Sequence, residues 1–170
     1  MSMTYVAFDI EATGLSAFND RICEFGAVRF SADGTVLETI QSLVQPSKPS
    51  SPNALAAHGL SDELLATAPL PRDVLPKFRD FLGHHRDVIL LAHNAEFDLG
   101  FLRVAFAELN LPEITHETHC TLDLARRKWR FPSYKLSALA DRFNFPTDQC
   151  HRALADAERV RLLWLILQRA

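Results

Sequence analysis

The chain lacks long hydrophobic runs and has few cysteines. Within its 170 residues, no apolar stretch approaches the roughly 18 residues of a membrane-spanning helix, so we expect no membrane partner. The N-terminus has no charged region followed by a secretory cleavage site. The 3 cysteines, Cys23, Cys120 and Cys150, are widely spaced and form no C-x-x-C pair. An odd number of isolated cysteines favours reduced thiols in a cytoplasmic protein over a disulfide framework.

The chain also lacks a large excess of charge of either sign. Its formal net charge is −3, with 48% apolar and 23% charged residues, an ordinary balance for a globular protein. This charge gives no general attraction to nucleic acids or membranes, so a polyanionic substrate would need local basic groups or metal ions. Because the length suits a single core and no repeat or linker divides the sequence, we expect one domain over residues 1–170.

The apolar periodicity predicts strands early in the chain and an alternation of helices and strands after them. We expect strands at 4–11, 22–31, 35–44, 88–92 and near 115–120. We expect helices around 54–57 and at 62–66, 72–83, 96–109, 121–129, 135–143 and 153–169. The continuous apolar run at 88–92 is typical of a strand covered on both faces. This order predicts an α/β fold, a mixed five-stranded sheet with helices on both faces.

Two carboxylates lie at the end of the first expected strand. Asp9 and Glu11 are two residues apart, so their side chains point to the same face of the strand. Two acids at the edge of an apolar core repel each other, and burying them without compensation costs free energy. Such a pair either shares a proton or binds a cation.

Two more acids lie at the starts of expected helices. Asp98 follows the fourth expected strand in the segment His93–Asp98, where a carboxylate can also serve only to stabilise the helix start. Asp156 shares one helix face with Val160, Leu163 and Leu167, so it should point toward the core. A lone acid there needs a partner, either a cation or an arginine.

The residues around Asp156 are expected to differ in their exposure. Glu158, Arg159 and Arg161 flank its apolar face and should be solvated. His151 precedes Asp156 by five positions in the expected loop before the helix. A solitary histidine is more often structural, but this one precedes a buried acid in a loop that could move.

Together these positions form a candidate hydrolytic set, consisting of Asp9, Glu11, Asp98, Asp156 and His151. Oxygen ligands suit hard divalent cations such as Mg²⁺ or Mn²⁺ better than zinc or copper. Two such ions about 4 Å apart can stabilise the attacking and leaving oxygens of a phosphoryl displacement. Since protons cannot reasonably neutralise four clustered carboxylates at pH 7, divalent metal is the expected state. The histidine, with an unperturbed pKa of about 6.5, can take a proton from the attacking water.

The three acidic segments resemble the motifs of the DEDDh branch of the DnaQ-like 3′→5′ exonucleases. These segments read FDIEATG at 8–14, HNAEFD at 93–98 and HRALADA at 151–157, and weaker similarity covers 20–28, 58–61 and 120–126. The resemblance runs from about Tyr5 to Leu167 and is nearest to the proofreading type of bacterial DNA polymerase III. Ala12 and Leu60 stand where the family often has threonine and isoleucine.

This resemblance implies an RNase H-like fold with two Mg²⁺ or Mn²⁺ ions held by Asp9, Glu11, Asp98 and Asp156. It implies that His151 is the general base and that nucleoside 5′-monophosphates leave from a 3′ end. The implied nucleotide contacts are Thr13, Gly14, Leu15, His58, Asn94, Phe97 and Phe101. Among these, Gly14 would allow close backbone approach and Leu15 would be an apolar wedge between bases. Phe97 and Phe101 are one helical turn apart, so core packing is an equally good interpretation for them.

The expected substrate is a single-stranded or frayed 3′ end, with DNA favoured by the proofreading-type resemblance. RNA stays open, because the sequence does not place contacts to the 2′ position. A polymerase partner is compatible with the resemblance, but the chain ends at Ala170, just past the last expected helix, without a tail to tether one. A catalytically idle binding module is disfavoured because all five residues of the set are present. A phosphatase with an aspartyl nucleophile usually shows D-x-D and would leave the third motif unexplained.

Three other patterns have weaker interpretations. The basic stretch Arg126–Arg130, followed by Tyr134 and Lys135, could bind phosphates and stack on bases, although such runs at helix ends are more often solvated. The sequence HETH at 116–119 is not the H-E-x-x-H zinc helix, because its histidines are three apart. Cys150 beside His151 is an improbable nucleophile–base pair, since adjacent residues rarely orient toward one another.

Overall fold

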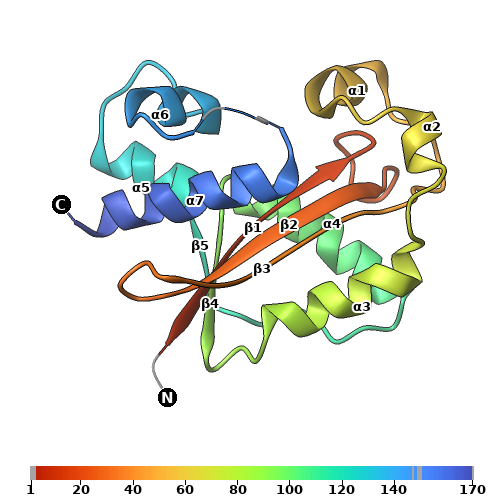
Figure 1. The fold of residues 1–170 in the computed structure, drawn as a ribbon, viewed down its shortest axis with the longest axis horizontal. Helices are drawn as coiled ribbons and strands as arrows, with labels where there is room; N and C mark the ends of the chain where they lie inside the picture. Colours follow the sequence, from red (N-terminus) through yellow and green to blue (C-terminus); the bar gives the residue numbers. More distant parts are fainter. Residues whose placement is uncertain (1–2, 147, 149–150, 170) are drawn as a thin grey trace.

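A single mixed sheet organises the molecule. The computed structural model describes residues 3–146, 148 and 151–169 (Figure 1). The strands are β1 (Thr4–Ala12), β2 (Ile22–Ser31), β3 (Val36–Leu43), β4 (Val88–Ala92) and β5 (Thr118–Cys120). They lie in the order β3-β2-β1-β4-β5, with β1 antiparallel to β2 and parallel to β4. The predicted five-stranded mixed sheet is confirmed.

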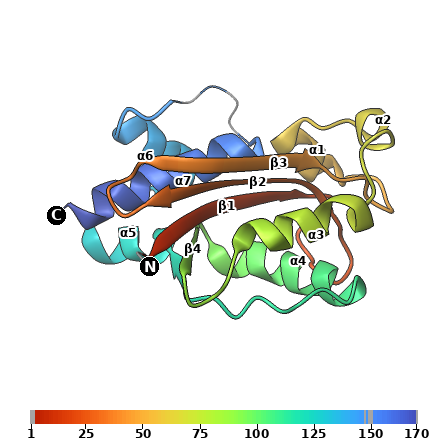
Figure 2. The ribbon, with the colours of Figure 1, turned by 60° about the horizontal axis from the view of Figure 1, so that its bottom comes forward.

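Helices cover both faces of this sheet, as predicted. They are α1 (Pro52–His58), α2 (Asp62–Leu65), α3 (Pro71–Leu82), α4 (Ala95–Glu108), α5 (Thr121–Lys128), α6 (Leu136–Arg142) and α7 (Ala153–Gln168). Figures 1 and 2 show α7 along one side of β1 and β2, with α3 and α4 on the other. No helix in the described part of the chain has the length and apolar character to cross a membrane.

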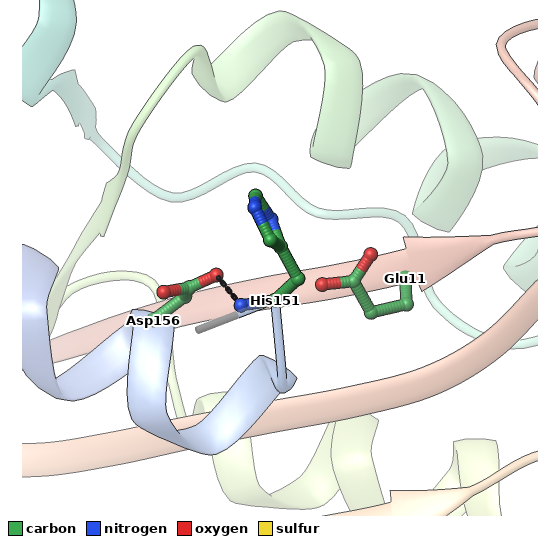
Figure 3. Close-up of side chains that lie close together, drawn as sticks. All are labelled: Glu11, His151 and Asp156. Carbon is green, nitrogen blue, oxygen red and sulfur yellow. Dashed lines mark hydrogen bonds between the residues drawn. The ribbon is translucent and has the colours of Figure 1, made fainter. Parts of the chain in front are cut away.

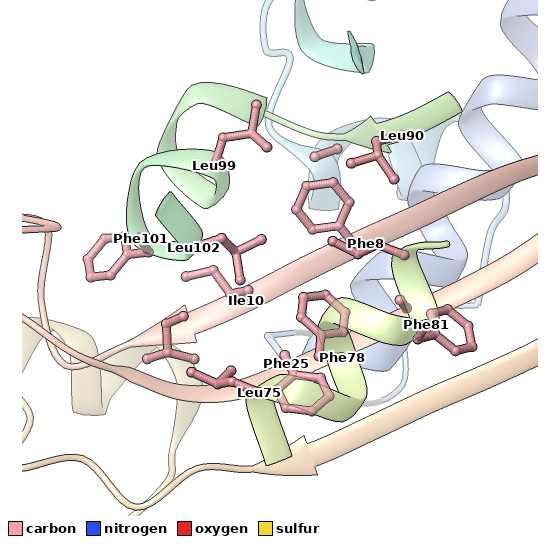
Figure 4. Packing of buried hydrophobic residues seen from close by; sticks show 14 of the residues in the cluster. Phe8, Ile10, Phe25, Leu75, Phe78, Phe81, Leu90, Leu99, Phe101 and Leu102 are labelled. Carbon is pink, nitrogen blue, oxygen red and sulfur yellow. The ribbon is translucent and has the colours of Figure 1, made fainter. Parts of the chain in front are cut away.

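Successive side chains of β1 point alternately to the main core and to the candidate site. Phe8 and Ile10 face α3 and α4 in the main hydrophobic cluster and are at most 3% exposed (Figure 4). Ala7 faces the opposite way, in a second cluster with residues of α7. Asp9 and Glu11 follow Ala7 at intervals of two, so they project on the α7 side of the sheet. Burial of the apolar side therefore fixes the direction of the two carboxylates.

Helix α7 lies against the sheet where β2 carries a glycine. Gly26 pairs with Asp9 across the antiparallel strands, so both positions face α7. A Cβ atom on Gly26 would lie 2.2 Å from the backbone nitrogen of Leu154 and 2.4 Å from its Cα. The absence of a side chain thus lets the first turn of α7 lie directly on the sheet beside Asp9.

The described cysteines are free thiols, in agreement with the prediction. Cys23 is buried in β2 and Cys120 is half-buried at the end of β5. Cys150, for which a nucleophilic role was considered and discounted, lies outside the described residues.

Candidate active site

The three acidic segments meet in one cleft of about 690 Å³. The cleft is lined by all five residues of the candidate set, Asp9, Glu11, Asp98, His151 and Asp156. Donor atoms of Glu11, His151 and Asp156 lie within 4.8 Å of one another, and Figure 3 shows these three side chains gathered from β1 and the start of α7. Such spacing is compatible with several donors around one cation.

Asp98 reaches this cleft because the chain turns sharply after β4. Asn94 has the left-handed conformation (φ 70°) between β4 and α4, and Asp98 then falls in the first turn of α4. The Oδ1 atom of Asp98 accepts a hydrogen bond from the backbone N–H of Ile10 at 3.0 Å. This bond ties the start of α4 to the part of β1 that carries Asp9 and Glu11.

Asp156 has both an arginine partner and a backbone partner. Its Oδ1 accepts from Arg159 Nη1 at 2.5 Å, and its Oδ2 accepts from the backbone N–H of His151 at 3.1 Å. The prediction that Arg159 is solvated is wrong, since Arg159 is 2% exposed. Its guanidinium also donates to the carbonyl oxygens of Pro146 and Asp148. Arg159 therefore ties Pro146 and Asp148 to α7.

The prediction of a solvated Arg161 is also wrong. Its side chain is 11% exposed and pairs with Glu158, whose side chain is 37% exposed. It also donates to the carbonyl oxygen of Gly34 at 2.7 Å. This pair anchors the middle of α7 to the turn between β2 and β3, away from the cleft.

Burial raises the pKa values of Asp9, Glu11 and Asp98, and mutual repulsion adds to it for Asp9 and Glu11. Burial, followed by the charges of Asp98 and Glu11, raises the pKa of Asp9 well above its ordinary value. Burial, followed by the charge of Asp156, raises the pKa of Glu11 to about 8. Burial raises the pKa of Asp98 to about 8, although the Ile10 N–H opposes this. The cluster is thus short of positive charge, and its oxygen donors fit hard divalent cations.

Glu24 ties the start of α7 to the sheet, a role that the sequence did not reveal. It pairs with Glu11 across β1 and β2 and is 2% exposed. Its carboxylate accepts from Arg152 Nε at 3.1 Å, from Arg152 Nη2 at 2.8 Å and from the backbone N–H of Ala153 at 3.1 Å. Because Arg152 follows His151, these bonds hold the backbone next to the histidine. The one sequence signal was that Glu24 falls in the weakly similar segment 20–28.

Replacing Glu24 with glutamine should loosen the start of α7. The amide cannot make a charged bidentate pair with Arg152, so we expect a loss of roughly 1–3 kcal/mol in unfolding free energy and faster hydrogen exchange at the Ala153 amide. Glu158→Gln is the matched control, because it breaks the Glu158–Arg161 pair of the same helix at a more exposed site. It should leave the Ala153 amide protected. Equal protection of this amide in wild type and Glu24→Gln would contradict the role of Glu24.

Four of the predicted nucleotide contacts, Gly14, Leu15, His58 and Phe97, lie around a smaller pocket beside Glu11. This pocket of about 200 Å³ is lined by residues that include Leu15, His58 and Phe97. Leu15 is 87% exposed, whereas His58 is buried. The Nδ1 atom of His58 accepts from the backbone N–H of Leu60 at 3.0 Å, so the neutral ring carries its proton on Nε2. Burial lowers the pKa of His58, which favours this neutral form.

Thr13 and Gly14 have a local structural task in the loop after β1. Thr13 is fully buried, and its hydroxyl oxygen accepts from the backbone N–H of Arg21 at 3.0 Å. A Cβ atom on Gly14 would lie 2.3 Å from Oδ2 of Asp20, so a side chain here would displace the carboxylate that accepts from the backbone N–H of Ser16 and pairs with Lys48. Gly14 also lines the smaller pocket, but the side chain of Thr13 is committed to the loop.

Asn94 and Phe101, the two remaining predicted contacts, are placed differently. Asn94 is exposed and lines the main cleft. Phe101 is 2% exposed and belongs to the main hydrophobic core, with its ring centroid 5.0 Å from that of Phe97. Phe101 therefore has no surface for a nucleotide, and the core-packing interpretation holds for it.

The predicted basic stretch divides between the cleft and a hydrophobic cluster. Arg126, Tyr134 and Lys135 line the cleft on the α5 and α6 side. Trp129 and Phe131 stack on each other, with ring centroids 5.5 Å apart, and pack in the cluster beneath α6 and α7. Arg126 and Lys135 are thus available to a ligand in the cleft, while Trp129 and Phe131 are used in packing.

Comparisons of the sequence place the chain among exonucleases. The model of the exonuclease family RNase_T matches residues 6–162. The chain is 37% identical over 164 residues to the DNA polymerase III PolC-type of Bacillus subtilis, covering 95% of this chain and 11% of that protein. It is 38% identical over 171 residues to the PolC-type of Streptococcus pyogenes, covering 98% of this chain and 11% of that protein. The chain therefore spans only about a tenth of the length of these relatives.

Solved structures share the fold. Escherichia coli exonuclease I in complex with a dT13 oligonucleotide has a TM-score of 0.90 and 16% identity, covering 99% of this chain and 41% of that chain. Exonuclease X in complex with 5′ overhanging duplex DNA has a TM-score of 0.74 and 30% identity, covering 96% of this chain and 90% of that chain. These likenesses confirm the RNase H-like fold. The match over residues 6–162 shows that this chain belongs to the RNase_T family of exonucleases.

Proposed function

We propose that the chain is a metal-dependent 3′→5′ exonuclease that releases nucleoside 5′-monophosphates from single-stranded or frayed DNA ends. The observation that carries this proposal is the meeting of Asp9, Glu11, Asp98, Asp156 and His151 in one cleft. The PolC-type relatives, and the DNA in the exonuclease I and exonuclease X complexes, favour DNA over RNA as the substrate.

Asp9, Glu11, Asp98 and Asp156 would hold two divalent ions, Mg²⁺ or Mn²⁺. Their oxygens are ligands that these ions prefer. Burial and the neighbouring carboxylates raise the pKa values of Asp9 and Glu11, and bound cations would offset both effects. When bound, such ions supply charge stabilisation to the attacking and leaving oxygens of phosphodiester hydrolysis.

His151 is proposed as the group that takes the proton from water. One of its ring nitrogens lies within 4.8 Å of carboxylate oxygens of Glu11 and Asp156. The bond from its backbone N–H to Asp156 fixes its place at the cleft while the ring stays exposed. In the smaller pocket, Leu15, His58 and Phe97 would hold the terminal nucleotide.

Labelled oligonucleotides and metal removal test this function. With Mg²⁺ or Mn²⁺, a 5′-labelled single strand should shorten one nucleotide at a time, and a 3′-label should leave at once as a mononucleotide. A chelator should abolish both changes, and added Mg²⁺ or Mn²⁺ should restore them, because no protein group replaces the charge of the ions. A matched RNA strand measures the preference for DNA. The proposal would be overturned if the strands stayed intact with Mg²⁺ and also with Mn²⁺, or if cleavage released internal fragments instead of mononucleotides.

We also propose a cytoplasmic setting and a polymerase as partner. The free thiols of Cys23 and Cys120 suit a reducing compartment. The PolC-type relatives are polymerases of which this chain matches one segment. Co-purification with a replicative polymerase would test the partnership.

A further inference from the structure

The cleft has a second wall, whose charge is opposite to that of the carboxylates. This wall consists of Arg126 on α5, Ser133 and Lys135 in the loop between the helices, and Ser137 on α6. The side chains of Arg126 and Lys135 belong to exposed residues. Arg126 faces Asp123 at 3.8 Å, with 58% of each side chain exposed, so solvent weakens that pairing.

Hydrogen bonds hold this wall in place. His93, at the end of β4, bonds through Nε2 to the carbonyl oxygen of Tyr134 at 2.8 Å and through Nδ1 to Thr121 Oγ1 at 3.0 Å. The Tyr134 hydroxyl donates to the carbonyl oxygen of Trp129 at 2.9 Å and accepts from the backbone N–H of Phe131 at 3.1 Å. The loop is thus ordered before a ligand arrives, which lowers the entropy cost of binding.

We infer that this wall binds the phosphodiester backbone of the strand next to the scissile bond, an inference that rests on the proposed exonuclease function. A polyanion approaching four carboxylates on a chain of net charge −3 meets repulsion. Ions held by the carboxylates would offset this repulsion for the scissile phosphate, whereas the neighbouring phosphates would need positively charged side chains of the protein. A guanidinium, an ammonium and two hydroxyls are the donors that backbone phosphates commonly meet. Such contacts carry no base information, so binding should not depend on sequence.

The wall should act on binding rather than on the chemical step. Contacts to a neighbouring phosphate are made equally in the substrate complex and in the transition state, so they lower KM and leave kcat unchanged. A substrate that has only the scissile phosphate should not depend on the wall.

The test compares two substrates in matched variants. The double variant Arg126→Gln and Lys135→Gln should raise KM for a single-stranded oligonucleotide by roughly 10- to 100-fold at unchanged kcat. The slope of the logarithm of the binding constant against the logarithm of the salt concentration should become shallower by about two. Hydrolysis of thymidine 5′-(p-nitrophenyl phosphate), which has a single phosphodiester, should be unchanged. Arg127→Gln is the control, because Arg127 is exposed on α5 next to Arg126 but does not line the cleft. It should behave as wild type on both substrates.

An unchanged KM in the double variant, or equal losses on both substrates, would overturn the inference. Failure of the proposed function would show differently, as a wild type that hydrolyses neither substrate. Fluorescence anisotropy with a single-stranded oligonucleotide and Ca²⁺ decides the matter without hydrolysis. Weaker binding by the double variant than by wild type and Arg127→Gln supports the wall, and equal or absent binding overturns it.

Discussion

Asp9→Asn should lose nearly all hydrolysis. Asparagine keeps the size of the side chain and one oxygen, but it supplies no negative charge to a metal ion. In the proposed site the loss should reach at least about 10³-fold in kcat/KM, which corresponds to roughly 4 kcal/mol of transition-state stabilisation. Asp9 lies on the α7 face of β1 and lines the cleft with the other carboxylates, where its charge would hold a metal ion.

The same substitution should make the metal-free protein more stable. Burial and the charges of Asp98 and Glu11 raise the pKa of Asp9, which means that a negative charge at this position costs free energy in the folded state. A neutral side chain of the same shape removes this cost, and we expect an increase of roughly 1–3 kcal/mol in unfolding free energy at neutral pH. For a chain of this size, each kcal/mol of added stability raises the Tm by about 2–4 °C, so the Tm should rise by a few degrees.

Thermal unfolding with a chelator, and then with Mn²⁺, separates the two effects. Wild type should gain stability from Mn²⁺, whereas Asp9→Asn should gain much less because it has lost a ligand. Asp141→Asn, at an exposed position of α6, should match wild type in activity and in both melts. An Asp9→Asn protein that melts below wild type without metal would contradict the view that the Asp9 charge destabilises the metal-free fold. A variant that keeps more than a tenth of the wild-type activity would contradict the role of Asp9 as a metal ligand.

Local periodicity made most of the fold and the carboxylate cluster predictable. The two-residue spacing of Asp9 and Glu11 fixes a common face, and the alternate residues Phe8 and Ile10 show which face is buried. The spacing of Asp156 within α7 likewise places it on the buried side. These patterns depend only on strand and helix geometry, so they are visible without knowledge of tertiary contacts.

The contacts that position the site depend on tertiary packing and were not predictable. Arg159 looked solvated because nothing in the sequence shows that the carbonyl oxygens of Pro146 and Asp148 cover it. The role of Glu24 depends on the strand register that pairs it with Glu11, and on Arg152, which is 128 residues away. Phe101 could be assigned to the core only when the direction of α4 was known.

Gly26→Ala should destabilise the fold and displace the start of α7. Its Cβ atom would lie 2.2 Å from the backbone nitrogen of Leu154 and 2.5 Å from the carbonyl carbon of Ala153. Backbone atoms cannot rotate away as a side chain can, so α7 must move by more than about 1 Å. We expect a loss of roughly 2–4 kcal/mol in unfolding free energy, at the upper end of overpacking effects. Activity should fall with it, because Asp156 and His151 move with the first turn of the helix.

Gly100→Ala is the matched control for this prediction. Gly100 lies inside α4, and a Cβ atom there would meet only Ala17 Cβ, at 3.8 Å, an ordinary van der Waals contact. Alanine is the better helix former, so this variant should gain roughly 0.5–1 kcal/mol and keep full activity. Chemical denaturation with activity assays on the folded fraction checks both variants. A Gly26→Ala protein with wild-type stability and activity would show that α7 can shift without cost, and that its contact with β2 does not place Asp156. The same glycine-to-alanine change should therefore lower the unfolding free energy at Gly26 and raise it at Gly100, because the new Cβ atom meets backbone at the first position and only an ordinary van der Waals contact at the second.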